Sequence, residues 1–216
     1  ERVLDLSIQI QRIPAPTFDE ARRARYLREI FLKEGLLDVE IDDISNVYAR
    51  LPGTGRARPL VVSAHSDTVF PEDTNLMIRR AEQRIYGPGI GDNSVGVAGL
   101  FGLIWLLRGE KIELPGDLWL VANVGEEGLG DLRGMRAVVD RFDDQPLGYL
   151  ILEGMALGQI YHRALGVQRY RIAVNTPGGH SWADYGHPSA INELAVMIGK
   201  LSQLSLPENP RTTLNV

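Results

Sequence analysis

The sequence predicts an α/β fold in which a mostly parallel sheet is flanked by helices, followed by the start of a smaller α+β domain. Over residues 1–164, short β-rich apolar runs alternate with helical patterns, which is typical of a sheet covered by helices. After about residue 165 the pattern changes to one alternating run, a glycine turn and one amphipathic helix. With 216 residues, 44% of them hydrophobic, the chain is long enough for one full domain and part of a second.

The first region, residues 1–164, contains one well-marked helix and several short strands. Thr17 and Glu20 have the spacing of a capping box, and apolar residues at helical spacing follow as far as Gly35, so we expect a helix over residues 18–34. Runs such as LVVSA are apolar throughout and favour strands covered on both faces. The same patterns predict strands over 46–51, 60–64, 118–124 and 148–152, and helices over 94–108 and 133–142.

The second region, residues 165–216, has a different sequence pattern. VQRYRIAVNT alternates apolar and polar residues as a half-exposed strand does, and PGGH reads as a turn. A helix is expected over residues 188–204, and RTTLNV at the end of the chain reads as the opening of another strand. This region is therefore expected to be the first part of a separate domain.

Composition narrows the classes of partner. The net charge is −5 and the isoelectric point about 5.4, and no basic cluster is present, so we expect no nucleic-acid partner. The most apolar run, residues 94–107, would span only about 21 Å as a helix, less than the roughly 30 Å core of a bilayer. We therefore expect a buried helix and no membrane partner, with small molecules or peptides as the partners.

The chain contains no cysteine. This excludes disulfides, thiolate metal ligands and a cysteine nucleophile. It is also compatible with a reducing compartment, and the first residues, ERVLDLSIQIQRIP, lack the pattern of a signal peptide. The expected location is the cytoplasm.

Two polar residues end the apolar run 60–64. In VVSAHSDTVFP, His65 and Asp67 are two positions apart, so along a strand both would point to the same face. They would lie at the carboxyl end of the strand, which is where open α/β sheets bind ligands.

Carboxylates stand in corresponding places elsewhere. Asp92 lies in the glycine-rich loop before the buried helix, Glu126 and Glu127 end LWLVANVGEE, and Glu153 follows GYLIL. Gathered at one sheet edge, these like charges would repel each other unless a divalent metal compensated them. One histidine with several carboxylates is typical of zinc or another first-row ion such as Co²⁺ or Mn²⁺. The sequence therefore predicts a metal centre.

The predicted metal centre suggests roles for the residues beside the metal ligands. Asp67 can accept the other imidazole N–H of His65 and fix the tautomer that faces the metal. Glu126 and Glu127 are adjacent, so we expect their side chains to point to opposite sides. One of them would bind metal and the other would remain free, as a general base beside metal-activated water.

Each residue also has a plain structural interpretation. An H-x-D pair often only closes a turn, Asp92 could cap the following helix, and an acidic residue after a strand, as at Glu153, is common. His180 could be a turn residue beside two glycines. The loop GPGIGD is not a dinucleotide-binding loop, because it lacks the third glycine and places a carboxylate where a pyrophosphate would lie.

Four motifs together resemble those of the dinuclear zinc exopeptidases and deacylases, a family that includes tripeptide aminopeptidase, carboxypeptidase G and aminoacylase. They are SAHSDTV, YGPGIGDNSVGVAG, VGEEGLGDLRGM and LEG, in the order and rough spacing of that family. The resemblance implies that residues 1–164 are the amino-terminal part of a catalytic metallopeptidase domain. It implies that residues 165–216 are the first part of a lid used for dimerisation.

The resemblance also implies residue roles. His65, Asp92 and Glu153 would hold one metal, and Asp92 would bridge to a second metal that Glu127 also binds. Glu126 would be the catalytic base and Asp67 would orient His65. The peptide bond after the bridging aspartate would be cis.

In the lid, GGHSWADYGHPSAIN resembles the stretch of the family that carries a substrate-contacting histidine, so His180 is expected to reach substrate, often across a homodimer. The family's catalytic domain resumes after the lid and supplies a last histidine ligand, for which no residue is found here. We therefore expect either an amino-terminal fragment or a form that cannot close its second metal site. The chain should be inactive alone and bind one metal better than two, or none if the bridging carboxylate needs both ions.

The expected function is metal-dependent cleavage of a peptide or N-acyl amino acid amide bond, by two zinc ions per complete site and a glutamate base. GDLRG is similar to tripeptide aminopeptidase relatives, whereas Glu153 is shared with carboxypeptidase-like members, so the substrate subclass stays open. The alternative is a non-catalytic metal-binding or assembly protein of the same fold.

Overall fold

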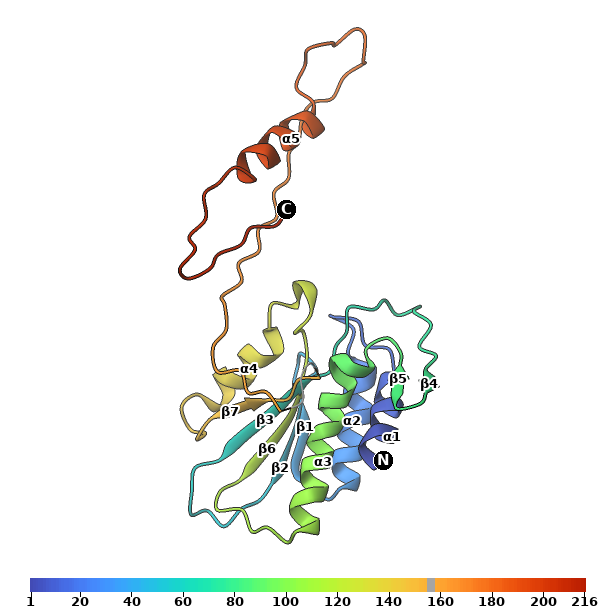
Figure 1. The fold of residues 1–216 in the computed structure, drawn as a ribbon, viewed down its shortest axis with the longest axis vertical. Helices are drawn as coiled ribbons and strands as arrows, with labels where there is room; N and C mark the ends of the chain where they lie inside the picture. The colour runs from blue at the N-terminus through green and yellow to red at the C-terminus, as the bar shows by residue number, and fades with distance from the viewer. Residues whose placement is uncertain (155–157) are drawn as a thin grey trace. The chain divides into compact units, whose positions relative to one another are not determined.

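A computed structural model describes residues 1–154 and 158–216 of the chain. The chain divides into two compact units, Glu1–Ile160 and Tyr161–Val216 (Figure 1). The helices, turns and strands of the first unit are α1 (Arg2–Gln11), α2 (Ala21–Lys33), β1 (Leu37–Ile41), β2 (Val47–Leu51), β3 (Leu60–His65), β4 (Arg79–Ala81), β5 (Arg84–Tyr86), the turn η1 (Ile90–Ser94), α3 (Val95–Gly109), β6 (Leu118–Asn123), the turn η2 (Gly128–Gly130), α4 (Arg133–Phe142) and β7 (Tyr149–Ile151). The second unit contains α5 (Ala190–Leu201).

A mixed sheet forms the centre of the first unit. Among the described residues it has five strands in the order β1-β2-β6-β3-β7, and a separate hairpin pairs β4 with β5. β3 is parallel to β6 and β7, whereas β2 is antiparallel to both β1 and β6. Of these five strands β2 alone therefore runs against the others, and the expected α/β class is confirmed. The register places His65, the last residue of β3, beside Asn123, the last residue of β6.

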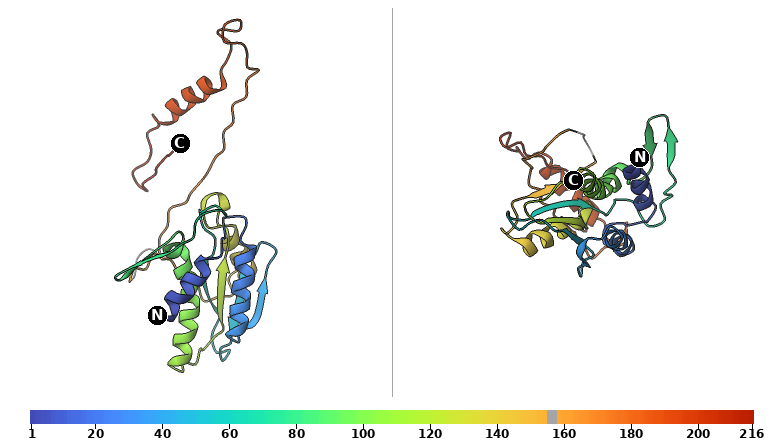
Figure 2. Two further views of the ribbon diagram at one scale, coloured as in Figure 1. Left: turned by 90° about the vertical axis from the view of Figure 1, so that its right-hand side faces the viewer. Right: turned by 90° about the horizontal axis from the view of Figure 1, so that it is seen from below.

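Both faces of this sheet are covered, as the apolar strand sequences predict. The helices α1, α2 and α3 pack on one face and α4 on the other (Figures 1 and 2). Neighbouring residues of β3 divide between the faces: Val62 packs with the three-helix side and Val61 with Phe142 of α4. A fully buried side chain of this size stabilises the fold by roughly 1.5–3 kcal/mol.

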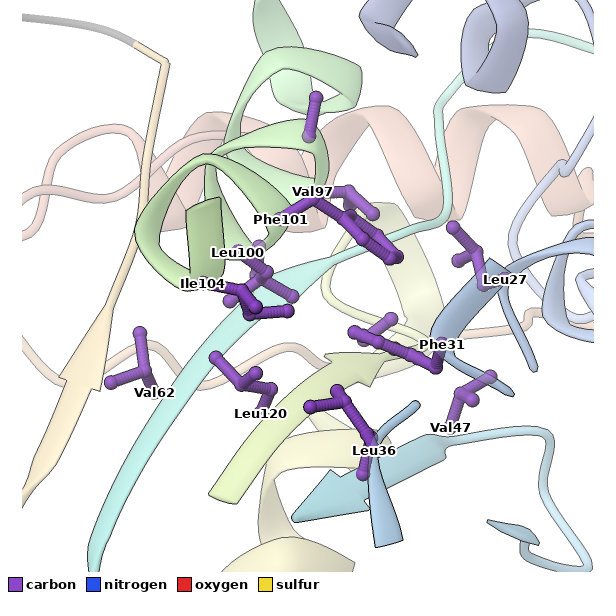
Figure 3. Packing of buried hydrophobic residues seen from close by; sticks show 14 of the residues in the cluster. Leu27, Phe31, Leu36, Val47, Val62, Val97, Leu100, Phe101, Ile104 and Leu120 are labelled. Atoms are coloured by element: carbon purple, nitrogen blue, oxygen red, sulfur yellow. The ribbon is translucent and has the colours of Figure 1, made fainter. Parts of the chain in front are cut away.

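Aromatic stacking joins the helices of the larger core. The rings of Phe31 in α2 and Phe101 in α3 lie 4.5 Å apart and nearly parallel. Figure 3 shows these two rings with Leu100 and Ile104 of α3 above the strands. Because α3 begins directly after η1, its packing on the sheet fixes the position of the loop that carries Asp92.

Most predicted elements of the first unit are present, with shifted ends. The helix expected over 18–34 is α2, and those expected over 94–108 and 133–142 are α3 and α4. The expected capping box is wrong: the Thr17 hydroxyl donates to Asp67, and Glu20 accepts from Arg133 and from the backbone N–H of Phe18. Both side chains are held by tertiary partners, which compete with the local cap. The elements that the sequence analysis did not predict are α1, β1, β4 and β5.

In the second unit, α5 matches the helix expected over 188–204, with Ser189 as its N-cap. Within the described part of this unit, the strands expected over 167–176 and 211–216 are not formed. A half-exposed strand gains little stability without a partner to bond with, and no partner strand is present in this described part. The boundary at 164/165 and the identification of residues 165–216 as a lid stay predictions.

One helical segment of the described residues, Ile90–Gly109, is long and apolar enough to cross a membrane by length and composition, with a mean hydropathy of 1.5. In the structure its helix α3 packs on the sheet, with Val97, Leu100, Phe101 and Ile104 buried in the core. A buried core helix can be as long and as apolar as a membrane-spanning helix.

Candidate metal centre

His65 is presented at the carboxyl end of β3. The strand lies between β6 and β7, so its backbone is bonded on both sides, and Leu152 adds a further bond to the Ser63 carbonyl just before His65. The imidazole is only 2% exposed. A buried, well-anchored ring can hold one orientation, which a metal ligand requires.

Asp92 reaches the same place from the loop before α3. The side chain of its neighbour Asn93 is fully buried and ties this loop down: Oδ1 accepts from Gly96 N at 3.0 Å, and Nδ2 donates to the Leu152 carbonyl at 2.8 Å. Asn93, not Asp92, therefore accepts a backbone N–H in the first turn of α3, whose N-cap residue is Ser94. A Cβ at Gly96 would lie 2.1 Å from Asn93 Oδ1, so this position requires glycine. The Asp92–Asn93 peptide bond is cis, as the family resemblance implies.

Two carboxylates converge on one nitrogen of His65. Nε2 lies 2.9 Å from Oδ1 of Asp92 and 3.2 Å from Oε1 of Glu153. Glu153 follows β7, which is parallel to β3, so both strands deliver their residues to the same edge. The carboxylates are partly open to solvent, with exposures of 57% for Asp92 and 42% for Glu153. Because these carboxylates are accessible, an ion from solution can reach the buried nitrogen that they face.

Asp67 is fully buried on the other side of the ring. Its Oδ1 lies 3.5 Å from His65 Nδ1, and the same oxygen accepts the backbone N–H of Glu126 at 3.1 Å. Its Oδ2 accepts the backbone N–H of Glu127 at 3.0 Å and the hydroxyl of Thr17 at 2.9 Å. One carboxylate therefore faces the histidine and also holds the backbone of both glutamates.

Glu126 and Glu127 lie beside His65, each half-buried. Their carboxylates and a ring nitrogen of His65 provide oxygens and nitrogen within 4.8 Å of one another. The expectation that the two side chains point to opposite sides is therefore wrong. The strand β6 ends at Asn123, and Gly125 has a φ of +63°, so the alternation of a strand no longer applies to the glutamates.

The electrostatics of the cluster fit a cation site. Burial raises the pKa values of Glu126 and Glu127, and neighbouring carboxylates raise them further, while His65 opposes the shift. Burial alone would lower the pKa of His65, but the carboxylates of Asp67 and Glu153 outweigh it and raise the pKa to about 11. For Asp67 the penalty of burial is outweighed by His65 and the two backbone N–H donors, so its pKa is lowered. In the metal-free protein a proton on His65 thus compensates the acidic cluster.

The donor set suits a first-row divalent metal. Two groups, His65 with Asp92 and Glu153 and His65 with Glu126 and Glu127, each place their ligand atoms within 4.8 Å of one another. One imidazole nitrogen with carboxylate oxygens is a combination that zinc accepts. The structure therefore brings together five of the seven residues expected to form the site and places a sixth, Asp67, directly behind them.

The seventh, His180, belongs to the second unit. It is exposed, and its Nδ1 accepts the backbone N–H groups of Trp182 and Ala183 at 3.2 and 3.3 Å. In the neutral ring this leaves the proton on Nε2. The role expected for His180 in substrate binding stays a prediction.

Several supporting residues were not found by reading the sequence. Asn46 is buried and accepts from Val124 N, while its Nδ2 donates to the Gly134 carbonyl, so it clamps both ends of the loop that carries the glutamates. Arg133, the first residue of α4, ion-pairs with the buried Glu20. The sequence signal for these residues is weak, because nothing in a lone asparagine or arginine reveals a partner 78 or more positions away.

Comparisons with known proteins identify the family and the fold of this chain. Residues 61–210, well over half of the chain, match the family described as Peptidase family M20/M25/M40. The chain is similar in structure to the aminopeptidase PepT of Bacillus cereus ATCC 10987, with 24% identity, a TM-score of 0.60, and coverage of 70% of this chain and 43% of that one.

Two further solved structures are similar. For a tripeptidase of Staphylococcus aureus subsp. aureus Mu50 the identity is 24%, the TM-score 0.61, and the coverage 72% of this chain and 43% of that one. For a dinuclear metal-binding M20 peptidase of Bacillus subtilis the identity is 16%, the TM-score 0.52, and the coverage 69% of this chain and 41% of that one. At such identities these likenesses show the fold, and the chain spans about two fifths of the length of each structure. By the family match over residues 61–210, this chain belongs to peptidase family M20/M25/M40.

Proposed function

We propose that the protein is a metal-dependent hydrolase that cleaves an amide bond in a peptide or an N-acyl amino acid. The observation that carries this proposal is the arrangement around His65, whose Nε2 faces Asp92 and Glu153 while Glu126 and Glu127 lie beside the same ring. The family membership supports it independently. The printed names of the similar structures, an aminopeptidase and a tripeptidase, favour short peptides as substrates.

We assign His65, Asp92 and Glu153 to one metal ion, and Asp92 and Glu127 to a second. Asp92 is suited to bridge, because its carboxylate is exposed and lies 2.9 Å from His65 Nε2, closer than that of Glu153. The similarity to a protein described as a dinuclear metal-binding peptidase supports two ions. We propose zinc as the metal, with Co²⁺ or Mn²⁺ as substitutes, since the donors are one nitrogen and several oxygens.

When bound, such ions polarise a substrate carbonyl and make water acidic enough to attack near neutral pH. We assign to Glu126 the acceptance of the proton from the attacking water on a carboxylate oxygen, and its transfer to the departing amine. Burial together with the surrounding carboxylates raises the pKa of Glu126, which brings it closer to the operating pH that a general base needs. Asp67 holds the Glu126 backbone in place, because its Oδ1 accepts the Glu126 N–H at 3.1 Å.

We further assign His180 to substrate binding within a homodimeric full-length protein. The proton on its Nε2 would donate a hydrogen bond to a substrate oxygen, because Nδ1 is already used by two backbone N–H groups. This assignment rests on the resemblance of its surrounding sequence to the family's lid.

The direct test is turnover by the full-length protein loaded with zinc, cobalt or manganese. Tripeptides, dipeptides and N-acyl amino acids are compared as substrates, and release of free amine is measured. We expect metal-dependent hydrolysis that is abolished by a chelator and restored by metal. Tight metal binding without turnover of any of these substrates would instead indicate a non-catalytic metal-binding protein of the same fold.

A further inference from the structure

The segment of residues 14–20 lies beside Asp67, behind the metal centre, and is not part of the four motifs that carry the family resemblance. It runs beside the residues that follow β3: Thr17 N donates to the Thr68 carbonyl at 3.3 Å, and Thr68 N donates to the Ala15 carbonyl at 2.9 Å. A parallel bridge also pairs Pro16 with Thr68. The segment is therefore fixed by its backbone directly beside Asp67.

Arg23 strengthens this connection. Its guanidinium is buried and donates to the Ile13 carbonyl at 2.9 Å and to the Ser66 carbonyl at 2.6 Å. Ser66 stands between His65 and Asp67 in the sequence. The start of the segment and the end of β3 are thus held by one side chain, which leaves little freedom in the position of Thr17.

The hydroxyl of Thr17 has one good acceptor. It lies 2.9 Å from Oδ2 of Asp67 and 3.5 Å from the Thr68 carbonyl, so it donates to Asp67. Three donors therefore bond this carboxylate: Glu126 N bonds to Oδ1, and Glu127 N and Thr17 bond to Oδ2, while His65 Nδ1 faces Oδ1 at 3.5 Å. Because Asp67 is fully buried, water cannot replace a lost donor.

We propose that Thr17 is a positioning residue of the metal centre, whose hydroxyl fixes the Asp67 carboxylate that in turn orients His65 and the Glu126–Glu127 backbone. The proposal rests on the function proposed above and deepens it by adding a residue from outside the motifs. Without the hydroxyl, Oδ2 of Asp67 keeps one donor instead of two. The carboxylate is then held less firmly against rotation, and the orientation of His65 becomes less well defined.

The test compares Thr17→Val with Thr17→Ser in the full-length protein. Valine keeps the size and branching of threonine but removes the hydroxyl, whereas serine keeps the hydroxyl. Ser7→Ala is the matched control, since Ser7 is a buried residue of α1 whose hydroxyl donates to the Val3 carbonyl, within the same helix. The readouts are the Co²⁺ affinity by competition with a chelator and the visible absorption spectrum of the bound Co²⁺.

We expect Thr17→Val to weaken Co²⁺ binding by about 10-fold, the lower end of the losses caused by changing outer-shell partners. The absorption spectrum of the bound Co²⁺ should also change. Thr17→Ser and Ser7→Ala are expected to match the unmodified protein. Equal Co²⁺ affinity and spectrum in Thr17→Val and the unmodified protein would overturn the proposal. Equal losses in Thr17→Val and Thr17→Ser, or in Thr17→Val and Ser7→Ala, would also overturn it.

Two other outcomes are distinct. If Thr17→Val does not fold, Thr17→Ala serves in its place, and failure of both would assign Thr17 to the stability of the fold and overturn the positioning role. If the unmodified protein binds no Co²⁺ or Zn²⁺, the metal centre and the proposed function fail, and the proposal fails with them for that reason.

Discussion

The Nε2 atom of His65 lies 2.9 Å from Oδ1 of Asp92, although 27 residues separate them in the chain. The histidine is 2% exposed and the aspartate side chain 57% exposed, so the contact joins the interior of the sheet to its solvent edge. Two parallel strands and the loop before α3 produce this arrangement.

Replacing Glu126 by glutamine is expected to separate chemistry from metal binding. The amide cannot accept a proton, so activity of the full-length protein should fall by about 10²–10⁴-fold. Zinc affinity should stay close to that of the unmodified protein, because Glu126 is not assigned as a ligand. Steady-state kinetics and zinc titration measure the two effects.

The matched control for that variant is Glu110→Gln, an exposed residue at the end of α3. It should leave both activity and zinc affinity unchanged. A loss of zinc together with activity in Glu126→Gln would show that the roles of Glu126 and Glu127 are exchanged.

Metal binding is expected to release a proton from His65. Its pKa in the metal-free fold is raised from 6.5 to about 11, so at pH 7 the ring is charged, whereas a metal requires the neutral form. Zinc affinity should therefore rise as the pH increases from 6 towards 9, because the competing proton is lost more readily. Calorimetric titrations in two buffers with different ionisation enthalpies report the proton directly. Identical heats in the two buffers would contradict the prediction.

Much of the site could be predicted because its residues follow apolar runs. His65 ends an easily recognised apolar strand, and Glu126, Glu127 and Glu153 come shortly after two others. Parallel strands then place these ends at one edge without further information. The opposite orientation expected for the two glutamates failed because β6 ends before them and Gly125 turns the chain.

The elements that were not predicted depend on tertiary contacts. In α1, LDLSIQI alternates apolar and polar residues, which is the spacing of a strand, yet the segment is helical and buries Leu6 and Ile10 against the core. Close packing on α3 is part of the reason, since a Cβ at Gly102 would lie 2.9 Å from Val3. β1 is an edge strand with mostly exposed residues, so its sequence has little apolar signal.

Loss of the Glu20 charge is expected to destabilise the fold. Glu20 is 2% exposed, and both of its oxygens accept from Arg133 Nη2, at 2.9 and 2.8 Å. Glu20→Gln leaves the Arg133 charge without its counter-ion, which should cost about 3 kcal/mol, the lower end for a buried pair because Arg133 is 25% exposed. Urea unfolding of the metal-free protein measures this.

The exposed pair of Arg22 and Glu72, at 3.2 Å, provides the comparison. Glu72→Gln should change the free energy of unfolding by less than about 1 kcal/mol, since water already screens that pair. If the two variants unfold at the same urea concentration, the buried ion pair does not stabilise the fold as described.

The most direct test of the metal centre is a zinc titration of the full-length protein and of two histidine variants. His65→Ala removes the histidine that both ligand groups contain, whereas His162→Ala removes an exposed histidine that belongs to neither group. We predict that His65→Ala weakens zinc binding by at least about 100-fold, since even outer-shell changes cost 10–100-fold, and that His162→Ala binds zinc normally. Equal zinc binding by His65→Ala and the unmodified protein would show that the metal centre proposed here does not exist.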